Sequence, residues 1–315
     1  MLRCWGGGIY EPEKFWKACD KYGIMVAQDF QMACGEYPYD DEDFMRKIKE
    51  EIPKAVKMLR NHTSLVFWIG DNENGMNFDF DDPLMYGRKI SGEITAPACR
   101  RLDPSRMFIP TSPYGGRKNT CLEIGDCHYA AWYAPALAGE DMTDYLEKVK
   151  TVGRFMSESV SVGCPSVESL KRFMTTEDMR DQEKYIWEYH TKDNPHNPEG
   201  SPTLFRLQEI ITEKLLGKWD NIADKIKKMG YVQYEWMRVS MEAARRSKWY
   251  CSGILYWMYN DCWPATGWSI VDYYGLPKAS WYALKRASKP VISSIEKSAD
   301  KYRIWLCNDL LRQIH

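Results

Sequence analysis

Two glutamates of this sequence stand directly after, or at the end of, runs that read as strands. Glu73 follows LVFWI (65–69) in the stretch LVFWIGDNENG, and Glu158 ends the run RFMSE (154–158). In (β/α)-barrel enzymes the catalytic groups stand at the carboxyl ends of parallel strands, around the mouth of the barrel. We therefore expect Glu73 and Glu158 to face each other across such a mouth.

A facing pair of carboxyl groups would suit the hydrolysis of a glycoside. Retaining glycosidases hold two carboxyl groups about 5 to 5.5 Å apart, one as nucleophile and one as acid/base. A single glutamate after a strand is more often solvated, or caps the next helix, than catalytic. Taken alone, each of the two residues is therefore also compatible with a simple polar turn. The amides and tryptophans at the other strand ends favour catalysis, because amides bind hydroxyl groups and flat rings cover the C–H face of a sugar.

Other kinds of catalytic site have less support. The histidines do not stand at HExxH or comparable spacing, so a metal site is not indicated, and His62 is interpreted as a packed loop residue. The sequence contains no G-x-S-x-G elbow for a serine nucleophile. We expect no cofactor.

Short β-like runs alternate with helical patterns along the chain. The predicted strands cover 2–5, 23–27, 65–69, 107–110, 121–129, 154–158 and 253–257. The predicted helices cover 11–22, 40–61, 84–102, 140–150, 165–173, 204–228, 231–248 and 278–288. Apolar strands alternating with helices are typical of a parallel sheet covered by helices. Because no phosphate-binding glycine motif is present, the pattern predicts an α/β fold of the (β/α)8 (TIM) barrel type.

The predicted barrel domain covers residues 1–290 and shows seven strands instead of eight. Its first strand begins at residue 2, so we expect the first β/α unit to be missing. An open barrel has two unpaired edges, which predicts low stability and weak activity for the chain alone. Residues 291–315 hold two further strand-like runs, which are too few for a sandwich and are interpreted as the beginning of a C-terminal β-sandwich domain.

The composition is that of a globular protein with a sizeable core. The 315 residues are 44% hydrophobic and 28% charged, with a net charge of −1. No basic run indicates a nucleic-acid partner, and no apolar stretch approaches the roughly 18 residues of a membrane span. Ten scattered cysteines without a CxxC pair are interpreted as buried thiols of a reducing compartment. This favours a cytoplasmic location; a secreted one stays open, because a signal peptide would lie upstream. The oligomeric state is not indicated.

Five stretches give the chain a resemblance to the catalytic domain of glycoside hydrolase family 2, specifically to its β-mannosidase branch. They are MLRCWGGGIYEPEKFWKACDKYGIMVAQDF, LRNHTSLVFWIGDNEN, GDCHY, RFMSES and GILYWMYNDCWPATGWSIVDYYGLPKASWYALKRASKPV. They occur in the order of the family and span most of residues 1–292. The resemblance labels the seven strands as the second to eighth of the barrel and implies that sandwich domains precede Met1.

The resemblance implies a retaining exo-β-glycosidase that removes terminal β-mannosyl residues from an oligosaccharide or glycoside. It implies that Glu73 is the acid/base and Glu158 the nucleophile, and that Asn72 contacts the sugar 2-hydroxyl. The −1 subsite, by the same resemblance, is lined by Trp5, Asp29, His128, Tyr129, Trp257 and Trp263.

Some positions depart from the family pattern and leave alternatives open. Ser159 follows the nucleophile where tyrosine is usual, and Ala27 and Ala130 replace tryptophans. Asp71 replaces an asparagine. The alternatives are another exo-enzyme of the family, of the β-glucosaminidase, β-galactosidase or β-glucuronidase type, or an inactive carbohydrate-binding remnant.

Overall fold

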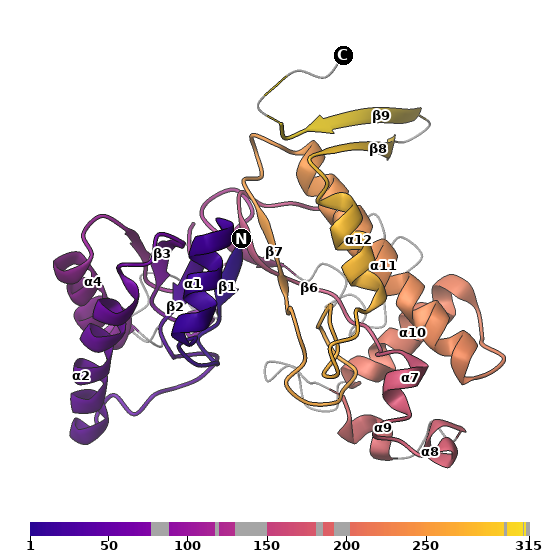
Figure 1. Cartoon of the computed structure of the whole chain (residues 1–315), viewed down its shortest axis with the longest axis horizontal. Helices are drawn as coiled ribbons and strands as arrows, with labels where there is room; N and C mark the ends of the chain where they lie inside the picture. The colour runs from indigo at the N-terminus through magenta and orange to yellow at the C-terminus, as the bar shows by residue number, and fades with distance from the viewer. Residues whose placement is uncertain are drawn as a thin grey trace. The chain divides into compact units, whose positions relative to one another are not determined.

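The computed structural model describes residues 1–76, 88–116, 120–129, 150–180, 185–191, 202–298, 301–310 and 312. They belong to two compact units (Figure 1), and each is described by itself. The first unit is Met1–His128 with Gly153–Ser157, and the second is Tyr129–Val152 with Glu158–His315. The boundary between the units passes through the strands β5 (Cys127–Tyr129) and β6 (Met156–Val160).

The first unit is built on a parallel sheet with the strand order β1-β2-β3-β4. These strands are β1 (Leu2–Cys4), β2 (Val26–Asp29), β3 (Leu65–Ile69) and β4 (Met107–Ile109). All four were predicted, but β2 begins three residues later than expected. Gly23 ends the preceding helix in the left-handed conformation, with φ of 65°, so it belongs to the turn and not to the strand.

Helices connect these strands as expected for βαβ units. α1 (Glu13–Tyr22) lies between β1 and β2, and α2 (Glu42–Leu59) lies between β2 and β3. The predicted helix 84–102 is observed from residue 88, and residues 84–87 lie outside the described ranges. It consists of α3 (Arg88–Ile90), the π-helix η1 (Ser91–Thr95) and α4 (Ala96–Leu102).

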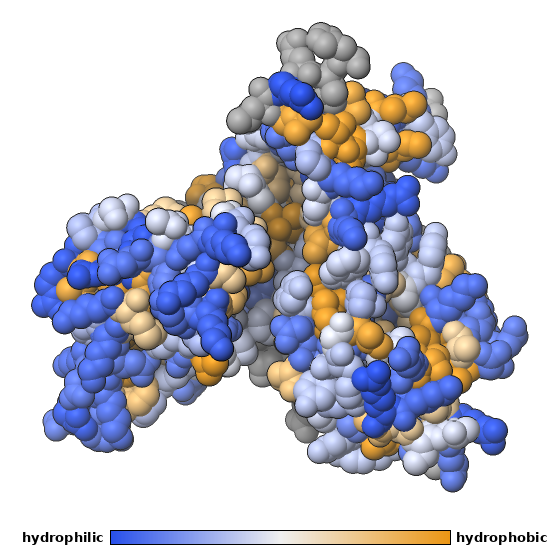
Figure 2. Space-filling view, in the orientation of Figure 1, coloured by the Kyte–Doolittle hydropathy of each residue, from blue (hydrophilic) through white to orange (hydrophobic). Residues whose placement is uncertain are grey.

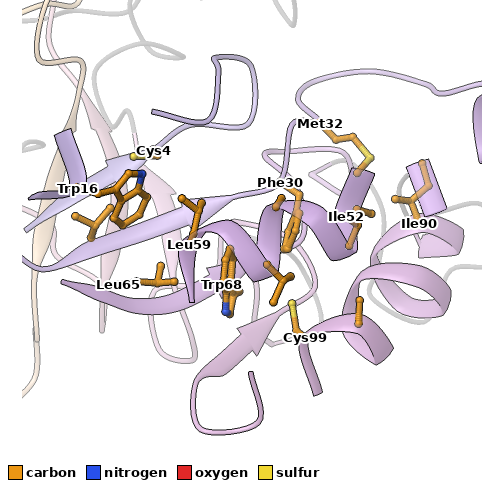
Figure 3. Packing of buried hydrophobic residues seen from close by; sticks show 14 of the residues in the cluster. Cys4, Trp16, Phe30, Met32, Ile52, Leu59, Leu65, Trp68, Ile90 and Cys99 are labelled. Atoms are coloured by element: carbon orange, nitrogen blue, oxygen red, sulfur yellow. The ribbon is translucent and has the colours of Figure 1, made fainter. Parts of the chain in front are cut away.

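The core of this unit is formed by the sheet together with helices α1, α2 and α4 (Figure 3). Trp16 of α1 and Trp68 of β3 are fully buried, and Phe30 stacks on Trp68 with a ring-centroid distance of 5.3 Å. His62 stacks on Trp16 and its Nδ1 atom lies 2.7 Å from Asp20. The interpretation of His62 as a packed loop residue is thus confirmed.

In the described ranges, the second unit contains three helices that are longer than its others. They are α10 (Leu204–Leu216), α11 (Ile222–Arg246) and α12 (Ala279–Ala287), besides the short α7 (Val167–Leu170), α8 (Thr176–Arg180) and α9 (Tyr185–Tyr189). The predicted break between helices at 228–231 is wrong, because the chain breaks at 217–221. Gly217 has φ of 72° and ends α10, and the Asn221 side chain caps α11, whereas Gly230 lies inside α11. The predicted helix 140–150 lies almost wholly outside the described ranges.

The last three predicted barrel strands are observed in the sheet β5-β6-β7, with β7 at Ile254–Trp257. Of the strand predicted at 121–129, only Cys127–Tyr129 is extended as β5, and residues 121–126 form bends and a bridge. β8 (Val291–Ser298) and β9 (Lys301–Asn308) form an antiparallel hairpin. Figure 2 shows apolar side chains gathered on this hairpin, and Ile295, Tyr302, Ile304 and Leu306 share one exposed face. An exposed apolar face on an antiparallel ribbon is consistent with the start of a β-sandwich, in which a second sheet covers it.

The cysteines and the helices give two further observations. All ten cysteines are reduced thiols, and seven of them are buried. Among the helices of the described ranges, none combines the length and the apolar character that crossing a bilayer requires.

Candidate active site

Glu73 lies in the loop after β3, and the neighbouring strand ends fix its backbone. Its N–H donates to the carbonyl of Ser112 (2.8 Å), and the N–H of Asn72 donates to the carbonyl of Met32 (2.9 Å). Cys34 in turn donates its N–H to the carbonyl of Asn72 (2.8 Å). These bonds continue the β2-β3-β4 pairing past the strands and hold Glu73 at φ of 61°, a conformation that costs a non-glycine residue about 1 kcal/mol or more. The strand ends thus fix the backbone from which the Glu73 side chain projects.

The carboxylate of Glu73 is largely enclosed and contacts the side chains of His128 and Cys34. Its Oε1 atom lies 2.6 Å from Nδ1 of His128, and its Oε2 accepts a hydrogen bond from the Cys34 thiol (3.4 Å). The side chains of Glu73 and His128 are 11% and 4% exposed. On its other side, His128 Nε2 lies 2.9 Å from Ser112 Oγ and 3.3 Å from Arg3 Nη1. A proton on Glu73 can therefore be exchanged with an imidazole.

Arg3 joins two of the expected sugar-binding residues. It donates from Nε and Nη2 to the two carboxylate oxygens of Asp29 (3.0 and 2.8 Å), and from Nη2 to Oδ1 of Asn72 (2.7 Å). The two-pronged contact with Asp29 fixes the guanidinium plane. The Asn72 amide is then oriented with Oδ1 toward Arg3 and Nδ2 toward Cys34 (3.3 Å). Asn72 is consequently a preorganised neighbour of Glu73.

The buried side chain of Asp71 anchors the loop that carries Glu73. It is 1% exposed and accepts hydrogen bonds from Thr111 (2.5 Å), Ser91 (2.9 Å) and the N–H of Asn74 (3.3 Å). Burial raises the pKa of the Asp71 carboxyl to about 7, although these hydrogen bonds lower it. Asp71 thus holds the loop that carries Glu73.

Asp126 is the acceptor at the centre of a buried group of hydroxyls. Its Oδ2 accepts from Ser112 (2.6 Å) and Ser157 (2.5 Å), and its Oδ1 accepts from the N–H of Tyr114 (2.7 Å). Ser112 also contacts His128, so Asp126 is linked through one hydroxyl to the imidazole beside Glu73.

Trp5 and the glycines after it make a close backbone turn at the end of β1. A Cβ atom on Gly6 would lie 2.3 Å from the Met32 carbonyl oxygen, and one on Gly7 would lie 2.0 Å from the Trp5 ring. The N–H of Gly6 donates to Asp29 (3.1 Å). The glycines allow the chain to approach the carboxylate of Asp29, with the Trp5 indole against Gly7.

The remaining predicted site residues belong to the second unit. Glu158 is a half-buried residue of β6, Trp257 is a half-buried residue at the end of β7, and the Trp263 ring stacks on His190 at 5.2 Å. The Tyr129 side chain lies outside the described part of the structure. The approach of these residues to Glu73, and the separation of the two glutamates, stay predictions.

The structure adds residues that sequence reasoning did not select. Arg3, Cys34 and Ser112 all contact predicted site residues, and Ser157 shares the Asp126 carboxylate with Ser112. An arginine within a short strand was a usable signal, since a charged side chain in a sheet needs a partner. The serines and Cys34 gave no comparable signal.

Comparison with known proteins assigns this arrangement to a family. Residues 10–201 match the model for the TIM barrel domain of glycosyl hydrolases family 2. The chain belongs to glycoside hydrolase family 2. This membership confirms the predicted family, the TIM barrel and the assignment as a glycoside hydrolase.

Several of the proteins similar to this chain are β-mannosidases by name. The chain is 30% identical to "Beta-mannosidase B" of Emericella nidulans, across 100% of the chain and 39% of that protein, and 32% identical to its namesake in Thermothelomyces thermophilus, across 94% and 36%. The crystal structure of the β-D-mannosidase from Dictyoglomus thermophilum matches with a TM-score of 0.85 and 33% identity, over 98% of the chain and 37% of that protein. An exo-chitosanase of Amycolatopsis orientalis, at 21% identity and a TM-score of 0.70, shares the fold. The family 2 chain thus spans about two fifths of the length of these β-mannosidases.

Proposed function

We propose that this family 2 chain carries the catalytic barrel of a retaining exo-β-mannosidase, with Glu73 as acid/base and Glu158 as nucleophile. The observation that carries the proposal is the environment of Glu73. Its carboxylate is enclosed, contacts an imidazole at 2.6 Å, and neighbours an asparagine that Arg3 orients. Similarity to three β-mannosidases supports mannose as the sugar.

The reaction proceeds by double displacement. Glu158 attacks the anomeric carbon and forms a glycosyl ester while the glycosidic C–O bond breaks, and Glu73 gives its proton to the departing oxygen. Glu73, now a carboxylate, removes a proton from a water molecule whose oxygen attacks the anomeric carbon. The ester bond to Glu158 breaks, the sugar leaves with its β-configuration, and Glu73 is protonated again.

Asn72 and Arg3 supply positioning in this proposal. An amide held by Arg3 cannot rotate freely, so it meets the sugar 2-hydroxyl without a loss of its own rotamer entropy. Hydrogen bonds to the 2-hydroxyl strengthen in the transition state of glycoside hydrolysis. Asp29 contributes by holding Arg3.

A panel of nitrophenyl β-glycosides tests the sugar, and proton NMR of the first product tests the stereochemistry. We expect turnover of the mannoside and initial release of the β-anomer. Turnover of the glucosaminide, galactoside or glucuronide without the mannoside would contradict β-mannosidase activity. Binding of mannosides without turnover of any glycoside would indicate a carbohydrate-binding remnant.

Substitution of the two glutamates tests their roles. Glu158→Gln should abolish turnover of all mannosides. Glu73→Gln should retain most of the kcat/KM for 2,4-dinitrophenyl mannoside, because its leaving group departs without a proton. Added azide should raise the turnover rate of this variant, because azide attacks the glycosyl ester in place of the water that the base activates. Glu168→Gln, on the exposed face of α7, is the matched control. Unchanged turnover of poor substrates by either site variant excludes the assigned pair.

A further inference from the structure

We infer that Asp126 and Ser112 are positioning residues for the acid/base: through hydrogen bonds they fix the hydrogen of His128 on Nε2, and thereby keep a proton between His128 and Glu73. The inference rests on the proposed role of Glu73. It concerns two residues that the sequence pattern does not assign to the reaction.

Asp126 determines which group donates in each of these hydrogen bonds. A carboxylate only accepts, so the hydroxyl of Ser112, 2.6 Å from Asp126 Oδ2, donates its single hydrogen there. Ser157 donates to the same oxygen (2.5 Å), and the N–H of Tyr114 serves the other oxygen. Ser112 is fully buried and Asp126 is 7% exposed, so bulk water does not compete for these bonds.

The hydrogen on Nε2 of His128 follows from this direction. With its hydrogen committed to Asp126, Ser112 Oγ can only accept, and Nε2 at 2.9 Å must donate. The reverse arrangement would turn a lone pair of Ser112 toward the carboxylate at 2.6 Å, which is repulsive. Arg3 Nη1 favours a bare Nε2, but it lies at 3.3 Å, and Arg3 already donates to Asp29 and Asn72 through its other nitrogens.

The opposite side of the ring then shares one proton with Glu73. Nδ1 and Oε1 are 2.6 Å apart, so either a carboxylic acid donates to the imidazole or an imidazolium donates to the carboxylate. Both forms carry the proton that the first step of hydrolysis consumes. Without Asp126 and Ser112, Arg3 would favour a bare Nε2, and the remaining hydrogen would sit on Nδ1 beside an ionised Glu73.

The charged and titratable groups near this pair come from several elements. The positive charge of Arg3 on β1 disfavours the proton that His128 and Glu73 share. Asp29 on β2 offsets this effect, because it forms an ion pair with Arg3. Cys34, after β2, contacts the other oxygen of Glu73. Asp126 thus acts on the Nε2 side of the ring through Ser112.

The first test is the pH profile of kcat/KM for a mannoside with a poor leaving group, such as 4-methylphenyl mannoside. An acid that must be protonated sets the basic limb of the profile. Ser112→Ala and Asp126→Asn should move this limb to lower pH by about one pH unit, whereas turnover of 2,4-dinitrophenyl mannoside should change less than about threefold. Ser157→Ala removes a donor to the same carboxylate without breaking the link to His128 and should leave the limb in place. Equal displacement by Ser157→Ala and Ser112→Ala would overturn the inference.

The second test does not depend on activity. In protein labelled with ¹⁵N-histidine, whose five histidines are assigned by single substitutions, His128 Nε2 should show the shift of a protonated nitrogen near neutral pH. Ser112→Ala should move it toward the shift of a bare nitrogen. An unprotonated Nε2 in the unsubstituted protein would overturn the inference, whether or not mannosides are hydrolysed. If Nε2 is protonated but mannosides are not hydrolysed, the result counts against the proposed function alone.

Discussion

His128 Nδ1 lies 2.6 Å from Glu73 Oε1, although 55 positions of sequence separate the two residues. The contact joins the loop after β3 to strand β5 and places a titratable ring against the proposed acid/base. Arg3 and Ser112 occupy the other side of the ring. The predictions below concern the residues that support this contact.

Arg3→Met should destabilise the protein by about 3–5 kcal/mol, because it leaves the buried Asp29 carboxylate without its cation. Chemical denaturation at pH 7 measures the loss. Arg46→Met is the matched control, since the ion pairs of Arg46 with Asp43 and Glu50 are exposed, and it should cost less than about 1 kcal/mol. Similar losses for the two variants would show that the Arg3–Asp29 pair does not support the fold.

Asp71→Asn should stabilise the protein more at pH 8 than at pH 5. The folded state raises the pKa of Asp71 to about 7, so the folded state binds more protons than the unfolded state between about pH 4 and 7, and its stability falls as the pH rises through this range. Asparagine does not titrate in this range. The free energy of unfolding of Asp71→Asn, relative to that of the unsubstituted protein, should therefore rise by up to about 3 kcal/mol from pH 5 to pH 8. Unfolding curves at both pH values measure the difference; an advantage independent of pH would contradict the assigned protonation.

Cys34→Ala should lower kcat/KM for poor mannoside substrates about fivefold, since it removes one hydrogen bond to Glu73 and one from Asn72. Cys34→Ser retains both partners and should recover most of the activity. Cys262→Ser, at an exposed thiol, is the control for the change of residue type. The idea fails if alanine and serine at position 34 behave alike.

Gly6→Ala should destabilise the protein by about 1–3 kcal/mol, because its Cβ would lie 2.3 Å from the Met32 carbonyl oxygen and 2.6 Å from that of Phe30. The strand ends must separate to admit the methyl group, which also disturbs the bond from Gly6 N–H to Asp29. Gly92→Ala meets no atom within 4 Å and should not destabilise the protein. Thermal unfolding of the two variants side by side measures the contrast.

The sequence predicted the ends of some elements correctly and missed the ends of others. LVFWI is observed as β3 with the expected ends, because an apolar run bounded by a glycine has few alternatives. The helical pattern of 204–248 did not show where the chain breaks. Gly217 and Gly230 look alike in sequence, and only the left-handed conformation of Gly217 ends a helix.

The sequence by itself determined the family, the alternation of strands and helices, and the position of Asn72 and Glu73 after a buried strand. These features are local, since they follow from residue types and their spacing along one segment. Only the tertiary structure placed Arg3 between Asp29 and Asn72, and set Asp126 and Ser112 behind His128. Such contacts join side chains as far as 125 positions apart in the case of Arg3 and His128. Nothing in the spacing of serines, cysteines and arginines along the chain encodes which strand ends meet.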